Sequence, residues 1–92
     1  MPPPKHIANY HEALGYDYGD WIKCEVPNCG LQSVDIHHIT PRSKFGSKRK
    51  DEQDNINNLI GLCRAHHNAA HDNKISKETL FEIVEVRNAN IK

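Results

Sequence analysis

The chain has 92 residues, and its 12 lysines and arginines balance 12 aspartates and glutamates, so the formal net charge is zero. A chain of this length forms at most one domain and buries a limited apolar area, so its folding margin is thin without further stabilisation. Zero net charge excludes a strongly cationic nucleic-acid binder. No apolar run suits a membrane span, and the first residues lack the apolar stretch of a secretory signal; we expect a cytoplasmic protein without membrane contact.

We expect residues 1–92 to form a single domain in which residues 1–20 make an N-terminal arm and a helix. The arm is rich in proline and is expected to be extended. Apolar positions from His6 to Leu14 have helical spacing, and Gly15 stands where a helix C-cap glycine is often found.

The core of the domain is expected to lie in residues 21–74. Residues 21–24 predict a strand, and the alternation from Ser33 to Ile39 predicts a second strand that ends at Pro41, which has no N–H to donate. Residues 42–53 predict a polar loop, residues 55–63 a turn followed by a short buried strand or helical turn, and residues 64–71 a helix. A last helix is predicted for residues 76–90, with Ser76 as its N-cap and apolar positions at helical spacing.

Three cysteines and one histidine have the spacing of metal ligands. Cys24 and Cys29 stand five positions apart on a predicted turn, while Cys63 and His66 stand three apart, which puts them on one face of a helical turn. Thiols beside histidines in a reducing cytosol more often bind metal than form a disulfide. We therefore expect a structural zinc that ties the turn to the helix, with His67 as an alternative fourth ligand. Buried free thiols are the competing interpretation.

Further histidines indicate a second metal site. His67 and His71 stand four positions apart, so both project from one face of a helix and could hold one metal. His37 and His38 point to opposite faces of a strand, so one could join the metal while the other keeps a nitrogen free toward a substrate. A metal that neutralises a phosphate and an imidazole that takes a proton from water are what phosphodiester hydrolysis needs.

The segment from Asp35 to His71 resembles the HNH endonuclease family. Residues 35–42 (DIHHITPR) resemble its first strand motif, residues 58–63 (NLIGLC) its central asparagine block, and residues 66–71 (HHNAAH) its helix. The resemblance covers residues 24–71. It implies an α+β chain with the small ββα-metal (His-Me finger) fold, here with a zinc clasp and flanking helices, and a phage or bacterial enzyme that hydrolyses DNA phosphodiester bonds with a single catalytic metal.

The resemblance also implies a role for each matching histidine. His38 would be the general base that activates water, and His37 would be a ligand of the catalytic metal. His67 would be the second ligand, and His71 would be the third ligand or a phosphate-contacting residue. Because imidazole suits transition metals, this ligand set weakens the preference for magnesium, and Mg²⁺, Mn²⁺, Ni²⁺ or Zn²⁺ could be the catalytic ion.

By the same resemblance, Asn58 would brace the loop between the strands and orient the base His38 by hydrogen bonding, with Asn55 as the competitor for that role. The chain departs from the family's usual zinc clasp of two Cys-x-x-Cys pairs. Four residues separate its first two cysteines, and His66 stands where the last cysteine is usual.

The basic residues of the predicted loop are the expected DNA contacts: Arg42, Lys44, Lys48, Arg49 and Lys50. They would bind phosphates, which gives affinity that depends on salt and little on sequence. Three acidic residues within 51–54 follow at once, so a solvated loop is the alternative interpretation. A protein partner or a homodimer could supply sequence specificity.

Two other functions stay open at this point. A non-catalytic zinc-binding module for DNA or protein would bind one tight zinc and would lack a second, exchangeable metal. An RNA-directed toxin nuclease would share every feature described above, so only a comparison of substrates separates it from a DNA endonuclease.

Overall fold

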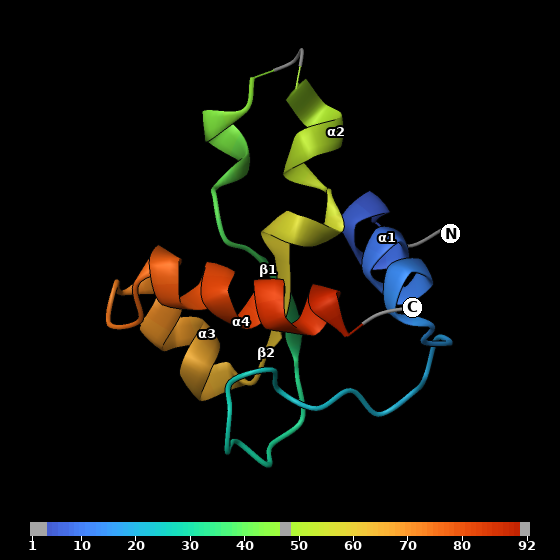
Figure 1. Ribbon diagram of the computed structural model, residues 1–92, viewed down its shortest axis with the longest axis vertical. Coiled ribbons are helices and arrows are strands. Elements are labelled where there is room, and N and C mark those ends of the chain that lie inside the picture. The colour runs from blue at the N-terminus through green and yellow to red at the C-terminus, as the bar shows by residue number, and fades with distance from the viewer. Residues whose placement is uncertain (1–3, 47–48, 91–92) are drawn as a thin grey trace.

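The computed structural model describes residues 4–46 and 49–90, a small mixed arrangement of helices around one two-stranded antiparallel sheet (Figure 1). The elements in chain order are α1 (Lys5–Leu14), β1 (Asp35–His38), the 3₁₀ turn η1 (Arg42–Lys44), α2 (Lys50–Gln53), the 3₁₀ turn η3 (Ile56–Asn58), β2 (Leu59–Leu62), α3 (Arg64–His71) and α4 (Lys77–Ala89). No helix within these ranges is long and apolar enough to cross a bilayer.

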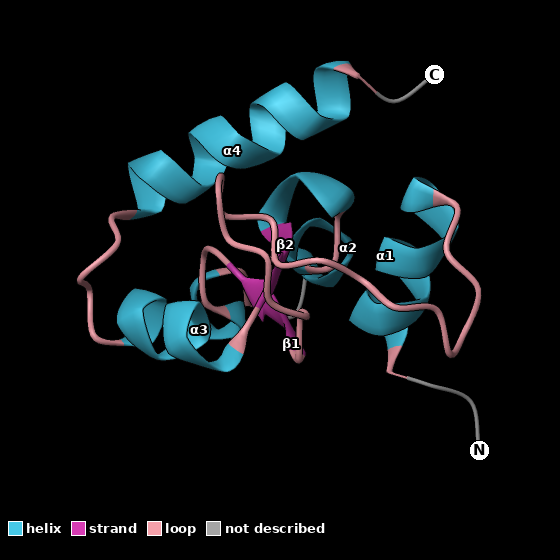
Figure 2. Cartoon of the chain, turned by 90° about the horizontal axis from the view of Figure 1, so that it is seen from below, coloured by secondary structure: helices cyan, strands magenta, loops and turns pink. Residues whose placement is uncertain are grey.

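The sheet places the two adjacent histidines of β1 on opposite faces. His37 lies opposite Ile60 and His38 opposite Leu59 in the antiparallel register. Helix α3 contacts the sheet on one side and α1 on the other, and α4 lies across the end of β2 (Figures 1 and 2). Each histidine of the pair therefore faces a different helix.

Three predicted elements differ from the observed ones. The strand predicted for residues 21–24 is wrong, because only a single bridge, Lys23 to Gln32, forms there. Ile22 and Cys24 are buried, whereas Trp21 and Leu31 stay 57% and 60% exposed, so the segment alternates like a strand but forms one isolated bridge rather than a ladder. The strand predicted for residues 33–39 is shorter, spanning residues 35–38. The predicted polar loop 42–53 contains η1 and the short helix α2, which project from one end of the sheet (Figure 1).

The three longer helices lie where the sequence predicts them, and their caps explain their bounds. Helix α1 ends at Gly15, which adopts the left-handed conformation with φ of 73°. Helix α4 begins after Ser76, whose side chain accepts a hydrogen bond from the N–H of Thr79 at 3.1 Å. The open choice for residues 55–63 resolves as η3 followed by strand β2, all four residues of which are buried.

Two apolar clusters form the core. One contains the three cysteines together with Leu62, Leu80 and Val84, so it joins β2 to α4. The other centres on Tyr10, Ile22 and Leu59, with Ile36 packed against it, and it fixes α1 against the sheet. The packing of α1 matters for the site described below, because it brings His6 to a cavity although no predicted ligand lies in this helix.

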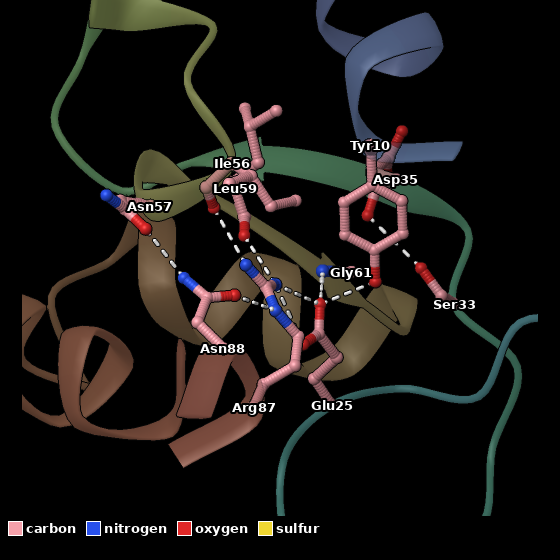
Figure 3. Close-up of polar contacts among 10 residues, drawn as sticks. All are labelled: Tyr10, Glu25, Ser33, Asp35, Ile56, Asn57, Leu59, Gly61, Arg87 and Asn88. Carbon is pink, nitrogen blue, oxygen red and sulfur yellow. Dashed lines mark hydrogen bonds and ion pairs between the residues drawn. The ribbon is translucent and has the colours of Figure 1, made fainter. Parts of the chain in front are cut away.

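An ion pair between Arg87 and Glu25, whose side chains are 14% and 11% exposed, ties α4 to both clusters (Figure 3). Arg87 donates from Nη1 to Glu25 Oε1 at 3.0 Å and to the carbonyl of Leu59 at 2.8 Å, and from Nη2 to the carbonyl of Ile56 at 2.7 Å. The apolar stripe of the predicted helix thus ends in a charge that faces inward, where carboxylate and carbonyl acceptors replace the water lost on burial.

Glu25 is held from the other side as well. Its Oε2 accepts hydrogen bonds from the N–H of Gly61 and from Tyr10 Oη, both at 2.6 Å (Figure 3). Burial, and next the charge of Glu25, raise the pKa of Tyr10, which therefore stays a neutral donor. A Cβ atom at position 61 would lie 2.8 Å from Tyr10 Oη and 2.9 Å from Ser33 Oγ, so any residue larger than glycine forces these side chains to shift.

Candidate functional site

Four of the predicted ligands come together as one compact group, which we call the Cys₃His cluster: Cys24, Cys29, Cys63 and His66. Their donor atoms all lie within 4.8 Å of one another, so the group could hold a metal such as zinc. The thiols are free, and the 3.9 Å between Cys29 Sγ and Cys63 Sγ excludes a disulfide between these two. His66, rather than His67, supplies the fourth donor.

The edges of the Cys₃His cluster match a tetrahedral zinc site. Four ligands at ordinary Zn–S and Zn–N distances are about 3.8 Å apart between sulfurs and about 3.6 Å apart between sulfur and nitrogen. The sulfur pair of Cys29 and Cys63 is 3.9 Å apart, and His66 Nδ1 lies 3.5 Å from Cys24 Sγ and 3.2 Å from Cys63 Sγ. The donor set therefore fits zinc in both chemistry and spacing.

Local backbone structure positions these four donors. Asn28, between the first two cysteines, has φ of 67°, which closes the turn that carries them. Cys63 is the N-cap of α3, and its Sγ accepts from the N–H of His66 at 3.5 Å. Burial raises the pKa of Cys24. For Cys63, burial also acts to raise the pKa, but hydrogen bonds to the sulfur, first from the N–H of His66, outweigh it, and the pKa is lowered. A lowered pKa suits a thiolate ligand at a helix N-terminus.

Next to the Cys₃His cluster lies a cavity of about 590 Å³, which we call the histidine pocket. It collects histidines from both faces of β1, from α1 and from α3. The polar residues that line it are His6, His37, His38, His67, His71, Asn73 and Lys77. Four of the five residues expected at the catalytic centre therefore share one cavity.

Two of the three expected ligands of the catalytic metal have suitable spacing. The rings of His37 and His67 are 5.3 Å apart between centroids. Two imidazoles on one tetrahedral metal at a metal–nitrogen distance of about 2.1 Å have centroids roughly 5 Å apart. His71 lies farther out, with its centroid 6.2 Å from that of His67. Over the described ranges, no group formed by these three histidines has all its donors within 4.8 Å, so the expected trio is looser than the Cys₃His cluster.

The pocket keeps His37 neutral and orients His67. Burial, and next the neighbouring imidazoles, lower the pKa of His37 from 6.5 to about 4, so this side chain is available as a ligand at neutral pH. Asp35 Oδ2 lies 3.2 Å from His67 Nδ1, and both atoms are buried without a well-formed hydrogen bond. A carboxylate beside Nδ1 favours the proton on that nitrogen and leaves Nε2 for a metal.

His38 occupies the other face of β1 and is held by Asp54. The distance from His38 Nε2 to Asp54 Oδ1 is 2.9 Å, and the two side chains are only 12% and 9% exposed. The ring of His6 from α1 lies against it, with 4.7 Å between centroids. The donor atoms of His6, His38 and Asp54 all lie within 4.8 Å of one another.

Asn58 braces the loop as expected, but its side chain does not hydrogen-bond His38. Its Oδ1 accepts from the N–H of Thr40 at 2.8 Å, and its Nδ2 donates to the carbonyls of Thr40 and Gln53, both at 3.0 Å. The carboxylate of Asp54 takes the orienting position that the resemblance gave to the asparagine. The prediction that Asn58 orients His38 is wrong, because the Asn58 side chain is needed to satisfy backbone groups of Thr40 and Gln53.

Asn55, the other asparagine considered for the role of orienting His38, caps η3 instead. It is the N-cap of η3, and its side chain accepts from the N–H of Asn57 at 2.9 Å.

The expected DNA contacts are only partly described. Lys44 is exposed, and Arg49 pairs with Glu52 at 2.6 Å while its guanidinium lies 5.4 Å from the Phe45 ring. Lys48 lies outside the described residues, and so do the side chains of Arg42 and Lys50. A role of this segment in DNA binding stays a prediction.

Five polar residues of the site were not predicted from the sequence: His6, Asp35, Asp54, Asn73 and Lys77. Strand alternation is a signal for Asp35, since residues two apart share a face and His37 is two positions on. Asp54 lies in an acidic run that composition alone assigns to solvent. His6 and Lys77 carry no local signal, because only the packing of α1 and α4 brings them to the cavity.

No family model, curated protein or solved structure matches the chain in comparisons with known proteins.

Proposed function

We propose that this chain is an HNH endonuclease of the ββα-metal fold that hydrolyses DNA phosphodiester bonds with a single catalytic metal. The observation that carries the proposal is the division of the histidine pair across β1. His37 lies beside His67 at ligand spacing, while His38 is held separately by Asp54, and all three histidines line one cavity.

His37 and His67 would hold the catalytic metal, and His71, whose ring centroid lies 6.2 Å from that of His67, would be the third ligand or a phosphate contact. When bound, the metal supplies a Lewis acid that neutralises charge on the phosphate and on the leaving oxygen. Because the pKa of His37 is lowered to about 4, this ligand is not blocked by a proton at neutral pH. Asp35 Oδ2, at 3.2 Å from His67 Nδ1, would favour the proton on that nitrogen and leave Nε2 as the donor to the metal.

His38 would act as the general base through Nδ1. An ionised Asp54 can only accept hydrogen bonds, so His38 Nε2, at 2.9 Å from it, carries the proton of the neutral imidazole. Nδ1 is then left with its lone pair to take a proton from water, and the carboxylate stabilises the imidazolium that forms. The same arrangement of carboxylate, histidine and reacting group serves in hydrolytic triads.

The Cys₃His cluster would be the structural clasp of the fold. It joins the turn at Cys24 and Cys29 to the first turn of α3, and α3 also carries His67 and His71. Closed four-ligand sites are typical of structural zinc, whereas catalytic sites keep a position open. Lys77, at the rim of the histidine pocket, is a cation suited to a phosphate of the substrate.

The test is cleavage of supercoiled plasmid by zinc-loaded protein, with Mg²⁺, Mn²⁺, Ni²⁺ or Zn²⁺ added separately. We expect metal-dependent nicking, and we expect His38→Ala to lower it by about 10²–10⁴-fold, the usual contribution of a general base. His11→Ala is the matched control, since His11 is a histidine outside the pocket that contacts Tyr16 and Tyr18. Undiminished cleavage by folded His38→Ala protein would refute the assignment of the base.

A non-catalytic zinc-binding module is the second candidate, favoured by the looser spacing of His71 from His67. It predicts one tight zinc per chain and no exchangeable metal, whereas the nuclease predicts both. Absence of cleavage with every metal, by folded protein that carries one zinc, would support the module. Structured RNA run beside the plasmid decides between DNA and RNA as the substrate.

A further inference from the structure

We propose that His6, His38 and Asp54 form an additional binding site for a divalent transition-metal ion, and that an ion bound there takes the general base out of action. The second half of this statement rests on the proposed function, whereas the first half does not. We call this group the His6 cluster.

The first support is geometric. Three donors from three separate segments, α1, β1 and the residues before η3, lie within 4.8 Å of one another. His38 Nε2 is 2.9 Å from Asp54 Oδ1, and the His6 ring centroid is 4.7 Å from that of His38. Two imidazoles and one carboxylate with open positions are a recurrent ligand set for divalent transition metals.

The second support is that the helix that carries His6 is held in place by a contact outside the cluster. Asn9 lies three positions after His6 on α1, so the two side chains share a face of the helix. Asn9 Nδ2 donates to the backbone carbonyl of Asp54 at 2.9 Å. The same helix is anchored by Tyr10, which is 1% exposed. The helix that carries His6 is thus bonded directly to the residue that carries the carboxylate.

The His6 cluster is separate from the other two groups of donors. Its members lie on the α1 side of β1, whereas His37 and His67 lie on the α3 side, and the Cys₃His cluster shares none of its residues. With two imidazoles and one carboxylate, the cluster suits Zn²⁺, Ni²⁺, Co²⁺ or Cu²⁺ and is poorly suited to Mg²⁺, which prefers oxygen ligands.

Binding at the His6 cluster would change the tautomer of His38. The nitrogen that faces Asp54 is Nε2, which carries the proton in the active form. An ion that takes this nitrogen leaves the proton of the neutral imidazole on Nδ1, so no proton is lost and the ring stays neutral. Nδ1 then has no lone pair to accept a proton from water, and the base is blocked.

Metal counting tests the site without reference to activity. Zinc-loaded protein is titrated with Co²⁺ and with Ni²⁺, and bound ions are counted by native mass spectrometry and calorimetry. We expect His6→Ala to lose one equivalent that His11→Ala, on the same helix, retains. Asp54→Asn, which keeps the shape of the side chain, should lose the same equivalent. Circular dichroism and zinc content establish that each variant is folded. An unchanged count in folded His6→Ala and Asp54→Asn overturns the site.

Inhibition tests the consequence. Plasmid nicking is activated with Mn²⁺ and then titrated with Ni²⁺ or Zn²⁺. We expect the wild type and His11→Ala to be inhibited. Inhibition of each variant is measured relative to its own uninhibited nicking rate, and on that scale His6→Ala should require about tenfold or more inhibitor, since loss of one ligand weakens the site at least as much as loss of an outer-shell partner. Equal inhibition of His6→Ala and wild type overturns the blocking role. Absence of nicking under every condition refutes the nuclease, while the metal count still decides the site.

Discussion

The Cys₃His cluster and the histidine pocket share one helix but differ in closure. Adjacent residues of α3 serve them, His66 the cluster and His67 the pocket. The cluster brings four donors within 4.8 Å, and its Cys24 and Cys63 are each 2% exposed. The pocket spreads its histidines around about 590 Å³ of open volume. The difference teaches that one short helix can supply a ligand to a closed group of donors and line an open, histidine-rich cavity with the adjacent residue, the two arrangements that distinguish structural from catalytic metal sites.

This sharing makes the pocket dependent on the cluster. The cysteines are also members of the larger apolar cluster of the core, which includes Leu80 and Val84 of α4. Loss of metal from the Cys₃His cluster would leave thiols that no longer fix the first turn of α3. The positions of His67 and His71 would then be lost together with the fold.

The largest effect is expected from breaking the closed site. Cys63→Ser should unfold the chain or leave it without a cooperative thermal transition, because structural zinc contributes on the order of 10 kcal/mol in zinc-finger peptides, about as much as the whole stability of a small domain. Thermal unfolding by circular dichroism and zinc content measure this. His71→Ala, on the same helix but outside the cluster, should keep both. A native transition in zinc-free Cys63→Ser protein would refute a structural role for the metal.

The adjacent histidines of α3 should give opposite results. His66→Ala should lose the tight zinc and most of the stability, whereas His67→Ala should keep zinc and fold but lose the exchangeable metal and nearly all nicking. Zinc content, the melting temperature and plasmid cleavage separate the two variants. If both lose only activity, or both lose the fold, the division of α3 between a closed and an open site is wrong.

A smaller effect is expected from Asp35→Asn, which removes the charge beside His67 Nδ1 and keeps the shape. Outer-shell carboxylates are worth about 10–100-fold in metal affinity, so Mn²⁺ or Ni²⁺ should bind the pocket weaker by that factor while zinc content is unchanged. Calorimetric titration of zinc-loaded protein is the measurement. Asp72→Asn, an exposed acid that follows α3, should bind like wild type. Unaltered affinity in Asp35→Asn would show that this carboxylate does not act through His67.

The smallest effect concerns pH. Burial, with the neighbouring imidazoles, lowers the pKa of folded His37 to about 4, below the unfolded value of 6.5. Between pH 6.5 and 4 the unfolded chain binds more protons at this residue than the folded chain does. His37 therefore leaves stability unchanged above pH 6.5 and lowers it increasingly as pH falls toward 4. In zinc-loaded protein with an empty pocket, the melting temperature should fall more steeply over this range in wild type than in His37→Gln. Parallel curves would contradict the shifted pKa.

The helix ends and the ligand spacing could be predicted from the sequence, because each depends on residues within a few positions of one another. The N-cap Ser76 and the C-cap Gly15 set helix ends through contacts within a few residues, and both lie at the observed ends. The ligand spacing of Cys63 and His66 follows from one helical turn, so the Cys₃His cluster was within reach of the sequence. The strand predicted at residues 21–24 has the expected alternation, with Ile22 and Cys24 buried, but the prediction failed because the segment forms only one isolated bridge, from Lys23 to Gln32.

The residue that orients His38 could not be predicted from spacing or motifs. The motif pointed to Asn58, but that side chain is used by the backbone of Thr40 and Gln53. Asp54 takes its place from within a charged run whose residues otherwise resemble a solvated loop, at 2.9 Å from the imidazole. A choice between two polar neighbours depends on which buried groups need partners, and sequence spacing does not contain that information.

The sequence by itself determined the helix ends, the three cysteine donors of the Cys₃His cluster and the placement of His37 and His38 on opposite faces of a strand, because caps, helical turns and strand alternation act over a few residues. Only the tertiary structure decided that His66 rather than His67 completes that cluster, that Asp35 faces His67, and that His6 and Asp54 surround His38. The physical reason is that these contacts follow from how α1 and α3 pack on the two faces of the sheet, with Tyr10 buried on one side and the cysteines on the other.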